Sequence, residues 1–190
     1  MLELHDVMVK PLQQTLSLTV DGGQMVCLSG PKGAGKTTVL RAVLGLQPIA
    51  GGYISIDGEL LTPLSASYFR KDMGYVPTRL VPIPGQERVA DVSRMLFGLS
   101  ENQHVKTEET DDRLWHELTL TEQYLKLLTL VTQQKRRLFL IDEPPMALEV
   151  VALNAMLDCL RELMASGASV LMANNLLSIS YLANNVILLK

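Results

Sequence analysis

Residues 30–37 read Gly30-Pro31-Lys32-Gly33-Ala34-Gly35-Lys36-Thr37 and match the pattern Gly-x-x-x-x-Gly-Lys-Ser/Thr. Glycines at these spacings allow successive backbone N–H groups to close around an anion. The lysine of the pattern reaches the outer phosphates of a nucleotide, and the hydroxyl after it coordinates magnesium. The stretch therefore predicts a phosphate-binding loop. A plain glycine turn is the alternative interpretation.

The segments on both sides of the loop favour the first interpretation. Residues 25–29 are short and mostly apolar, which is typical of a strand buried in a parallel sheet. After the loop we expect a helix from about Gly35 to Leu46, because apolar side chains recur there at helical spacing (Val39, Leu40, Val43 and Leu44). The N-terminus of that helix would direct its positive end at the anion.

A second acidic motif follows another apolar run, in Leu138-Phe139-Leu140-Ile141-Asp142-Glu143. The four apolar residues predict a buried strand, and Asp142 comes at its end, where open parallel sheets bind their ligands. A carboxylate there can hold magnesium, and Glu143 can act as the general base for water. The alternative is that the two acids lie in solvent and cap the start of a helix.

The two motifs together define the predicted site, and its predicted ligands are ATP and Mg²⁺. Thr37 and Asp142 are the predicted metal ligands, and Glu143 is the predicted catalytic residue. The predicted nucleotide-binding residues are consecutive: Gly30, Pro31, Lys32, Gly33, Ala34, Gly35, Lys36, Thr37 and Thr38.

The rest of the chain alternates strand patterns with helical ones. Further strands are expected at 2–9, 12–20, 53–56, 73–76, 170–172 and 186–189, and further helices at 121–134 and 147–165. This alternation predicts an α/β fold with a mostly parallel sheet between helices. We expect a single domain over 1–190, with a core of about 1–78 and 136–190 and a mainly helical insertion at about 79–135.

The composition excludes several other classes of protein. The chain has 190 residues, and its formal net charge of −3 argues against a general nucleic-acid-binding protein. Cys27 and Cys159 lie far apart in apolar stretches, so we expect free thiols in a reducing compartment. The N-terminus lacks a signal-peptide pattern, and no apolar run reaches the ~18 residues that span a bilayer. Residues 135–137, Lys-Arg-Arg, favour a solvated turn before a buried strand; the alternative is a phosphate or lipid site.

Within the insertion, prolines predict a loop over 77–88, an amphipathic segment covers 89–99, and polar residues predict an exposed connection over 100–112. The acids Glu108, Glu109, Asp111 and Asp112 are expected in the first turn of a helix that contains Leu114 and Trp115. His104 and His116 lack metal-ligand spacing and are expected at the surface.

The phosphate loop, residues 51–58 and Asp142-Glu143-Pro144 together resemble the ATP-binding cassette (ABC) ATPases, and the resemblance extends to residues 182–186. It covers nearly the whole chain. It implies a P-loop NTPase fold with an antiparallel β part near the N-terminus and a short helical subdomain. It also implies that Asp142 binds metal, that Glu143 is catalytic, and that Glu149 replaces the aspartate of the family's D-loop.

The chain departs from the family at positions that complete or couple the site. Thr78 stands in place of the glutamine that follows Tyr-Val-Pro, and Asn175 stands in place of the switch histidine. Asn can donate a hydrogen bond to a phosphate but cannot carry a charge. Residues 1–29 contain no Phe, Tyr or Trp that could stack on adenine, so the sequence leaves the choice of base open.

The family's signature, Leu-Ser-Gly-Gly-Gln, is replaced by Leu118-Thr119-Leu120-Thr121-Glu122. Leu120 would crowd a backbone that must approach a phosphate, and Glu122 would place a negative charge near that phosphate. A structural interpretation fits better: Thr119 and Glu122 form a capping box that starts the next helix. A shift of one residue would make Gln123 the signature glutamine but would still supply no glycine.

In this family two cassettes pair head to tail and drive membrane-embedded permease subunits. The resemblance therefore implies a weakly hydrolysing ABC-type ATPase subunit that is cytoplasmic, peripheral on the inner face of the cell membrane, and part of a homodimer or of a heterodimer with another cassette. The family docks its permease near the loop Pro77–Gly85, where Leu80, Val81 and Ile83 are candidates; the alternative is that this loop packs on its own core.

Two other functions stay open at this stage. A nucleotide-dependent regulatory module without meaningful turnover is favoured by Thr78, Asn175 and the missing glycines. A soluble P-loop kinase or GTPase is weakened because no nucleoside-specific or acceptor-substrate motif is found. The transported substrate cannot be read from this chain, because in such systems the permease generally sets specificity.

Overall fold

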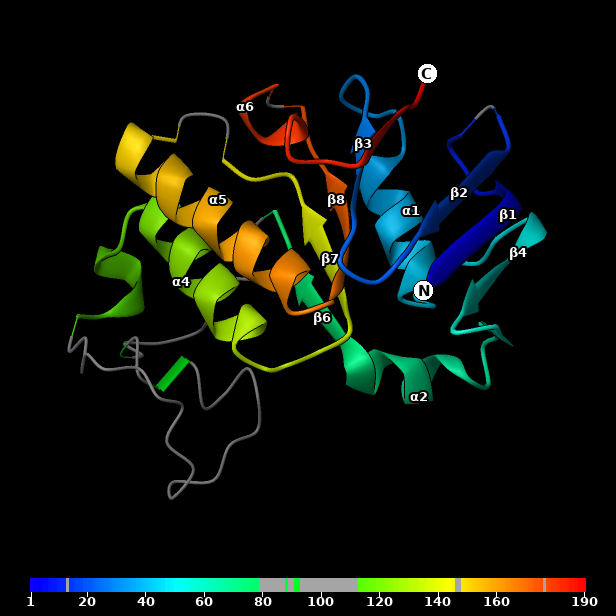
Figure 1. The fold of residues 1–190 in the computed structure, drawn as a ribbon, viewed down its shortest axis with the longest axis horizontal. Helices are drawn as coiled ribbons and strands as arrows, with labels where there is room; N and C mark the ends of the chain where they lie inside the picture. The colour runs from blue at the N-terminus through cyan, green and yellow to red at the C-terminus, as the bar shows by residue number, and fades with distance from the viewer. Residues whose placement is uncertain (13, 79–87, 89–90, 93–112, 146–147, 176) are drawn as a thin grey trace.

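The computed structural model describes all residues except 13, 79–87, 89–90, 93–112, 146–147 and 176. Its strands form two sheets (Figure 1). A 4-stranded antiparallel sheet has the order β2-β1-β4-β5, and a 5-stranded parallel sheet has the order β6-β7-β8-β3-β9. The predicted α/β fold, with a mostly parallel sheet and an antiparallel β part near the N-terminus, is confirmed.

The bounds of the elements are as follows. The strands are β1 (Leu2–Met8), β2 (Leu16–Val20), β3 (Met25–Ser29), β4 (Gly51–Ile56), β5 (Glu59–Leu60), β6 (Met73–Val76), β7 (Leu138–Asp142), β8 (Ser169–Ala173) and β9 (Asn185–Leu188). The helices are α1 (Lys36–Val43), α2 (Ala66–Phe69), α4 (Leu120–Thr132), α5 (Val150–Ala165), α6 (Leu177–Ser180) and the 3-10 turns η1 (Arg70–Asp72) and η2 (Trp115–Glu117).

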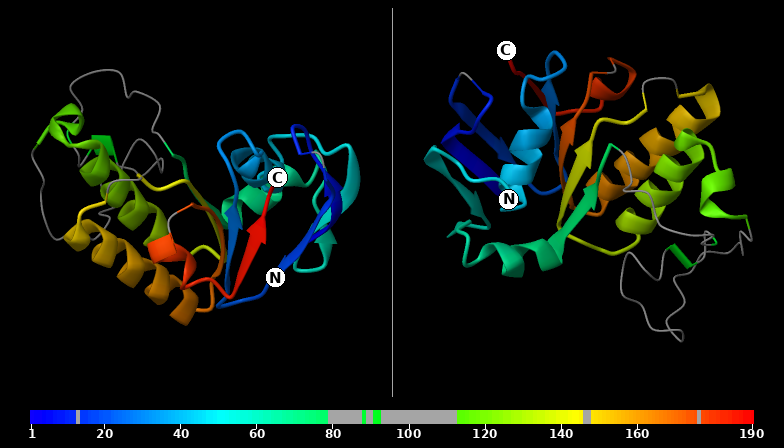
Figure 2. Two further views of the ribbon diagram at one scale, coloured as in Figure 1. Left: turned by 90° about the horizontal axis from the view of Figure 1, so that it is seen from above. Right: turned by 180° about the vertical axis from the view of Figure 1, so that it is seen from behind.

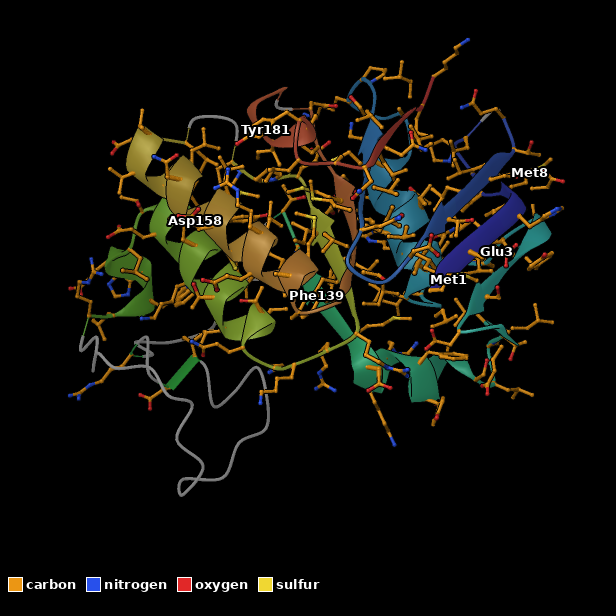
Figure 3. The ribbon with its side chains drawn as sticks, in the orientation of Figure 1. Met1, Glu3, Met8, Phe139, Asp158 and Tyr181 are labelled. Atoms are coloured by element: carbon orange, nitrogen blue, oxygen red, sulfur yellow. The ribbon has the colours of Figure 1, made fainter. Side chains whose placement is uncertain are left out.

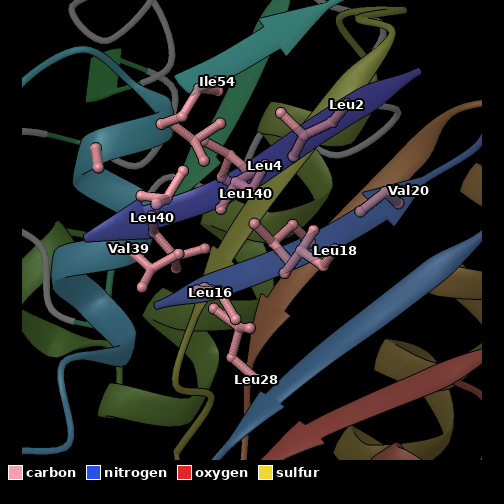
Figure 4. Close-up of a cluster of buried hydrophobic side chains, with 14 of the residues drawn as sticks. Leu2, Leu4, Leu16, Leu18, Val20, Leu28, Val39, Leu40, Ile54 and Leu140 are labelled. Carbon is pink, nitrogen blue, oxygen red and sulfur yellow. The ribbon is translucent and has the colours of Figure 1, made fainter. Parts of the chain in front are cut away.

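Strand β7 shows how the parallel sheet separates two apolar cores. Its side chains alternate between the two faces of the sheet, as expected for a strand buried on both sides. Leu138 and Leu140 join the core that α1 shares with the antiparallel sheet (Figure 4). Phe139 and Ile141 join the core beneath α4 and α5. Figure 2 shows the antiparallel sheet and these two helices on opposite sides of the parallel sheet.

Phe139 (Figure 3) fills the second core at a place where the neighbouring strand has no side chain. A Cβ atom on Gly74 of β6 would lie 2.6 Å from the Phe139 ring and 2.9 Å from Val131 of α4. Gly74 is therefore required by space, because the aromatic ring and the helix occupy the volume of its missing side chain. This contact packs the C-terminal part of α4 against β6 and β7.

Several strand and helix limits differ from the prediction, among them the starts of β2 and α5. The expected strand over 12–20 begins only at Leu16, because the chain turns at Pro11 and the Leu12 side chain packs against the phosphate loop, within 3.3 Å of a Cβ placed on Gly35. Helix α5 begins at Val150 rather than 147, because Glu149 has extended backbone angles. Apolar spacing locates the body of a helix but not its first turn.

The expected helix containing Leu114 and Trp115 is wrong. Leu114 is extended and pairs with Arg88 in an isolated bridge, and residues 115–117 form one 3-10 turn. The Glu117 carboxylate accepts a 2.8 Å bond from the Leu114 N–H, and the Gln123 side chain donates to the carbonyls of Trp115 and Leu118. These bonds satisfy the backbone within a single turn and fold it onto α4.

Other predictions within the insertion lie outside the described residues, wholly or for the most part. They are the loop over 77–88 with its docking candidates Leu80, Val81 and Ile83, the amphipathic segment 89–99, the connection 100–112, His104, and the acids Glu108, Glu109, Asp111 and Asp112. The helical subdomain at about 79–135 therefore stays a prediction, to which the structure contributes η2 and α4.

Three further sequence predictions concern thiols and the membrane. Cys27 and Cys159 are both free, as expected. Burial raises the pKa of the Cys27 thiol to about 12, so this cysteine is an inert core residue. Among the residues that the structure describes, no helix combines the length and the apolar character needed to cross a membrane.

Candidate nucleotide-binding site

Strand register brings the two predicted motifs to one edge of the parallel sheet. Leu28 near the end of β3 pairs with Ala173 of β8, and Asp142 at the end of β7 pairs with the same Ala173 from the other side. The phosphate loop that follows β3 and the acidic pair at the end of β7 therefore flank the residues that follow β8. Figure 1 shows these three strands running toward this shared edge, where ligands of open parallel sheets bind.

The phosphate loop leaves the N-terminus of α1 free of side-chain caps. Gly33 and Gly35 have φ angles of 89° and 92°, in the left-handed region that glycine adopts without strain. Gly35 is the N-cap residue, so it has no side chain that could bond the first N–H groups of α1, and the first turn carries no acidic residue. These unpaired N–H groups and the helix dipole favour an external anion.

Lys36 lies almost completely buried beneath the loop, with 3% of its side chain exposed. Its ammonium donates to the carbonyls of Gly30 (2.7 Å) and Pro31 (3.0 Å) and pairs with the Glu143 carboxylate at 2.9 Å. A lysine ammonium has three N–H donors, so every donor of Lys36 has an acceptor. A buried charge needs such partners, and any phosphate oxygen that contacts Lys36 must replace or share one of them.

Thr37 and Asp142 lie together at the start of α1. The Thr37 hydroxyl donates to the Asp142 carboxylate at 2.9 Å, and the Tyr75 hydroxyl from β6 lies 3.5 Å from the other carboxylate oxygen. Asp142 is 2% exposed, and this burial raises the pKa of its carboxyl group, while the bond from Thr37 opposes the rise.

This pair of oxygens fits a magnesium ion. Mg²⁺ in nucleotide sites takes only one or two protein oxygens and completes its shell with water and phosphates. Among the described residues no group of three or more His, Cys, Asp or Glu side chains gathers at one point, so a dedicated all-protein metal cage is absent from that part of the chain. Thr37 and Asp142 beside an uncapped helix N-terminus match the donor set that a nucleotide-borne ion requires.

Glu143 occupies the position between buried lysine and solvent that a general base needs. It is 37% exposed, so its carboxylate contacts water as well as Lys36. Its backbone φ of 22° is positive, which costs energy for a residue with a side chain; strained residues of this kind cluster at active sites, although Asp6, Asp57 and Lys135 also have positive φ angles.

The nine predicted nucleotide-binding residues differ in exposure. Pro31, Lys32 and Gly33 are exposed at the rim, whereas Ala34, Gly35 and Lys36 are buried at the base. Gly30, Thr37 and Thr38 are half-buried. The structure thus brings the loop, the metal pair and Glu143 together, and their roles toward a ligand stay predictions.

Tyr75 is a neighbour of this site that sequence reasoning missed. Its hydroxyl lies 3.5 Å from the carboxylate of Asp142, the predicted metal ligand on the adjacent strand, and burial raises the pKa of the Tyr75 phenol. The only indication of this contact is the pairing of the strands: Tyr75 on β6 lies opposite Leu140 on β7, two residues before Asp142. The sequence alone does not give the order of the strands, so it could not show that Tyr75 lies near Asp142.

In the segment at the expected signature position, the side chains of Thr119 and Glu122 cap the N-terminus of α4. Thr119 is the N-cap of α4, and its hydroxyl accepts from the Glu122 N–H at 3.2 Å. The Glu122 carboxylate accepts from the Thr119 N–H and hydroxyl and from Arg113, each at 2.8 Å. The predicted capping box is confirmed. These bonds, the backbone one first, lower the pKa of Glu122 to about 2.

Comparison with known proteins identifies a family model that matches residues 13–146, described as "ABC transporter". An uncharacterized ABC transporter ATP-binding protein of Haemophilus influenzae is 28% identical over 95% of this chain and 75% of its own length. The nickel import ATP-binding protein LarO of Lactiplantibacillus plantarum is 32% identical over 84% and 74%. An Fe(3+) ions import ATP-binding protein of Pseudomonas fluorescens is 30% identical over 78% of this chain, which spans only 46% of that relative.

Solved structures agree on the fold. The ATP-binding subunit of an ABC transporter superposes with a TM-score of 0.80 at 24% identity, covering 100% of this chain and 85% of the other. A nucleotide-free ATP-binding cassette from an ABC transporter also superposes with a TM-score of 0.80, at 16% identity, covering 99% and 87%. At such identities the likeness concerns the fold alone.

Proposed function

The chain belongs to the ABC transporter family of ATP-binding proteins, and from that membership we propose that it is the Mg-ATP-binding subunit of a membrane transport complex, with weak hydrolysis of its own. The observation that carries the proposal is the arrangement of Lys36, Thr37, Asp142 and Glu143 around an uncapped helix N-terminus. Family membership makes the chain an ABC-type ATPase. The strength of its hydrolysis is our inference from the segment that begins α4.

The residues of the site divide the work of binding and hydrolysis. The N-terminal N–H groups of α1 hold phosphate oxygens, and Lys36 exchanges one of its present partners for another phosphate oxygen. Thr37 and Asp142 hold magnesium, which when bound neutralises phosphate charge. Once Lys36 turns to phosphate, Glu143 is free to accept a proton from an attacking water molecule.

We infer weak turnover because the residues at the start of α4 are poorly suited to contact a phosphate. In the family each phosphate site is completed by the signature segment of a second cassette. Here that segment has Leu120 exposed by 75% at the first turn of α4, and the Glu122 carboxylate already accepts from the Thr119 N–H. A carboxylate at this point repels phosphate, and a leucine holds the backbone away from it. Two copies of this chain would therefore complete each other's sites poorly.

The same observation favours one alternative: a nucleotide-dependent regulatory module in which bound ATP holds a conformation and turnover has no role. The intact Glu143 favours the enzyme, while the self-capped α4 favours the module. Cleavage of ATP in a single turnover separates the two.

We infer that its partners are a permease in the cell membrane and a second cassette, identical or different, so that the chain works in the cytoplasm on the inner face of the membrane. The import systems for which relatives are named support this assignment. Those names include nickel and Fe(3+) ions, so they point to no single cargo, and the permease is the place to look for it.

Fractionation of the native cell tests the transport assignment. A tagged copy of the chain is expected to sediment with membranes and, after detergent extraction, to co-purify with a multi-span protein identifiable by mass spectrometry. Recovery of the full-length protein wholly in the soluble fraction, with no multi-span companion, would favour the regulatory module instead.

A further inference from the structure

Asn175 follows β8 at the point where that strand lies between the phosphate loop and the acidic pair. The N–H of the preceding Asn174 continues the sheet by donating to the Leu28 carbonyl at 3.0 Å. Asn174 is fully buried, and its own amide group donates to the Ser180 hydroxyl at 3.2 Å. The backbone that carries Asn175 is therefore fixed on its N-terminal side, at Asn174.

The Asn175 side chain contacts the first residue of the phosphate loop. Its Oδ1 atom accepts a hydrogen bond from the Gly30 N–H at 3.1 Å and a longer one from the Ser29 hydroxyl at 3.4 Å. A backbone N–H can only donate, so the atom that faces Gly30 must be the carbonyl oxygen of the amide. This requirement sets the orientation of the Asn175 side chain.

Gly30 contacts both Asn175, through its N–H, and Lys36, through its carbonyl. Its carbonyl accepts the shortest of the three contacts of the Lys36 ammonium, at 2.7 Å. On the opposite side, a Cβ on Gly30 would lie 2.5 Å from the Leu189 carbonyl, and the Leu189 N–H donates to Ser29 at 2.7 Å. Rotation of the peptide before Gly30 would disturb the conformation of the residue whose carbonyl holds the lysine.

We propose that Asn175 is a positioning residue of the phosphate loop: it holds the Gly30 N–H, and through Gly30 it places the ammonium of Lys36. Its action is on the protein, not on the bound nucleotide, although it stands where the resemblance places a switch histidine. The effect on nucleotide affinity rests on the proposed function; the effect on Gly30 does not.

Amide exchange measured by NMR on the nucleotide-free protein tests the contact itself. The Gly30 N–H is expected to exchange slowly in the wild type and in Asn175→Asp, whose carboxylate keeps an acceptor. It is expected to exchange quickly in Asn175→Leu, which has none. Unchanged slow exchange in Asn175→Leu would overturn the proposal.

A matched control is available at the other end of β3. Asn184 accepts from the Met25 N–H at 2.9 Å, so Asn184→Leu removes the same kind of bond from the same strand, away from the phosphate loop. This variant should expose the Met25 N–H, leave the Gly30 N–H protected and bind nucleotide like the wild type. If it exposed Gly30 as strongly as Asn175→Leu does, the local role of Asn175 would be refuted.

Calorimetry with ATP and with ADP then separates positioning from direct contact with the nucleotide. Asn175→Leu should weaken both by the same factor, about fivefold, the size of one neutral hydrogen bond. A loss for ATP alone, with ADP affinity unchanged, would assign Asn175 to the terminal phosphate and overturn the proposal. If the wild type bound neither nucleotide, the proposed function would fail, and the exchange experiment would still decide the contact between Asn175 and Gly30.

Discussion

The N-termini of α1 and α4 are built in opposite ways. Gly35 begins α1 with no side-chain cap and no acid in the first turn. Thr119 begins α4 with a complete capping box: its hydroxyl accepts from the Glu122 N–H, and the Glu122 carboxylate accepts from the Thr119 N–H. Both helices present the same backbone N–H groups and the same dipole.

A helix N-terminus is therefore an anion site only where the chain supplies no anion of its own. Glycines at the start of α1 leave space and free donors, and Lys36 adds charge from below. At α4 an internal carboxylate, itself paired with Arg113, already occupies the equivalent place.

The largest effect is expected from Lys36→Ala, which removes the charge beneath the α1 N-terminus. Loss of a buried, charge-assisted contact should weaken Mg-ATP binding by about 100-fold, or ~3 kcal/mol. Isothermal titration calorimetry measures this directly, with Lys71→Ala as the control because that lysine is exposed on η1. Equal affinity of the wild type and Lys36→Ala would remove the phosphate-loop assignment.

The second-largest effect, on the rate of ATP hydrolysis, is expected when the N-terminus of α4 is changed to leave its N–H groups uncapped, as in α1. The triple variant Leu120→Gly, Thr121→Gly and Glu122→Gln restores the family's signature residues at these positions. If the chain forms a homodimer, the rate of ATP hydrolysis should rise by at least about tenfold, since one electrostatic contact in a transition state is typically worth more than that. Ultracentrifugation must show the dimer; an unchanged rate in a confirmed dimer would contradict the account of α4.

The fold, the glycine loop before α1 and the cap of α4 could be predicted from the sequence, because they depend on local patterns. Glycine spacing identified the loop, and the Thr119 to Glu122 spacing identified the cap. The ion pair between Lys36 and Glu143 could not be predicted, because it joins residues whose proximity depends on strand order. The helix expected at Leu114 failed for a related reason: the side chain of Gln123, eight residues after Trp115, satisfies its carbonyls.

Breaking the ion pair between Lys36 and Glu143 should give a smaller effect. Glu143→Gln removes a carboxylate that competes with phosphate for Lys36, so affinity for a non-hydrolysable ATP analogue should rise. Because Glu143 is more than one-third exposed, the gain is discounted to about twofold to fivefold, or ~0.5–1 kcal/mol. Weaker binding of the analogue by Glu143→Gln than by the wild type would refute this competition.

The smallest effect is expected on the stability of the fold at low pH, through the carboxyl group of Glu122. Since folding lowers the pKa of Glu122 from an ordinary 4.5 to about 2, its contribution to stability is present above pH 4.5 and is lost as the pH falls through about 2. NMR titration of the Glu122 carboxyl carbon should give that low pKa, and Arg113→Ala should raise it. An ordinary pKa in the wild type would show that the cap does not form in solution.

The central claim is that this chain binds nucleotide at the uncapped N-terminus of α1 but cannot complete a second site with the self-capped N-terminus of α4. Single-turnover cleavage of ATP, with the purified chain in excess over radiolabelled Mg-ATP, tests this claim most directly. We expect the nucleotide to be bound in the micromolar range, about −8 kcal/mol, while phosphate is released barely above the uncatalysed background. Glu143→Gln should reduce even that release. Rapid cleavage by the wild-type chain alone would contradict the account, because it would require a completed site that a self-capped α4 cannot supply.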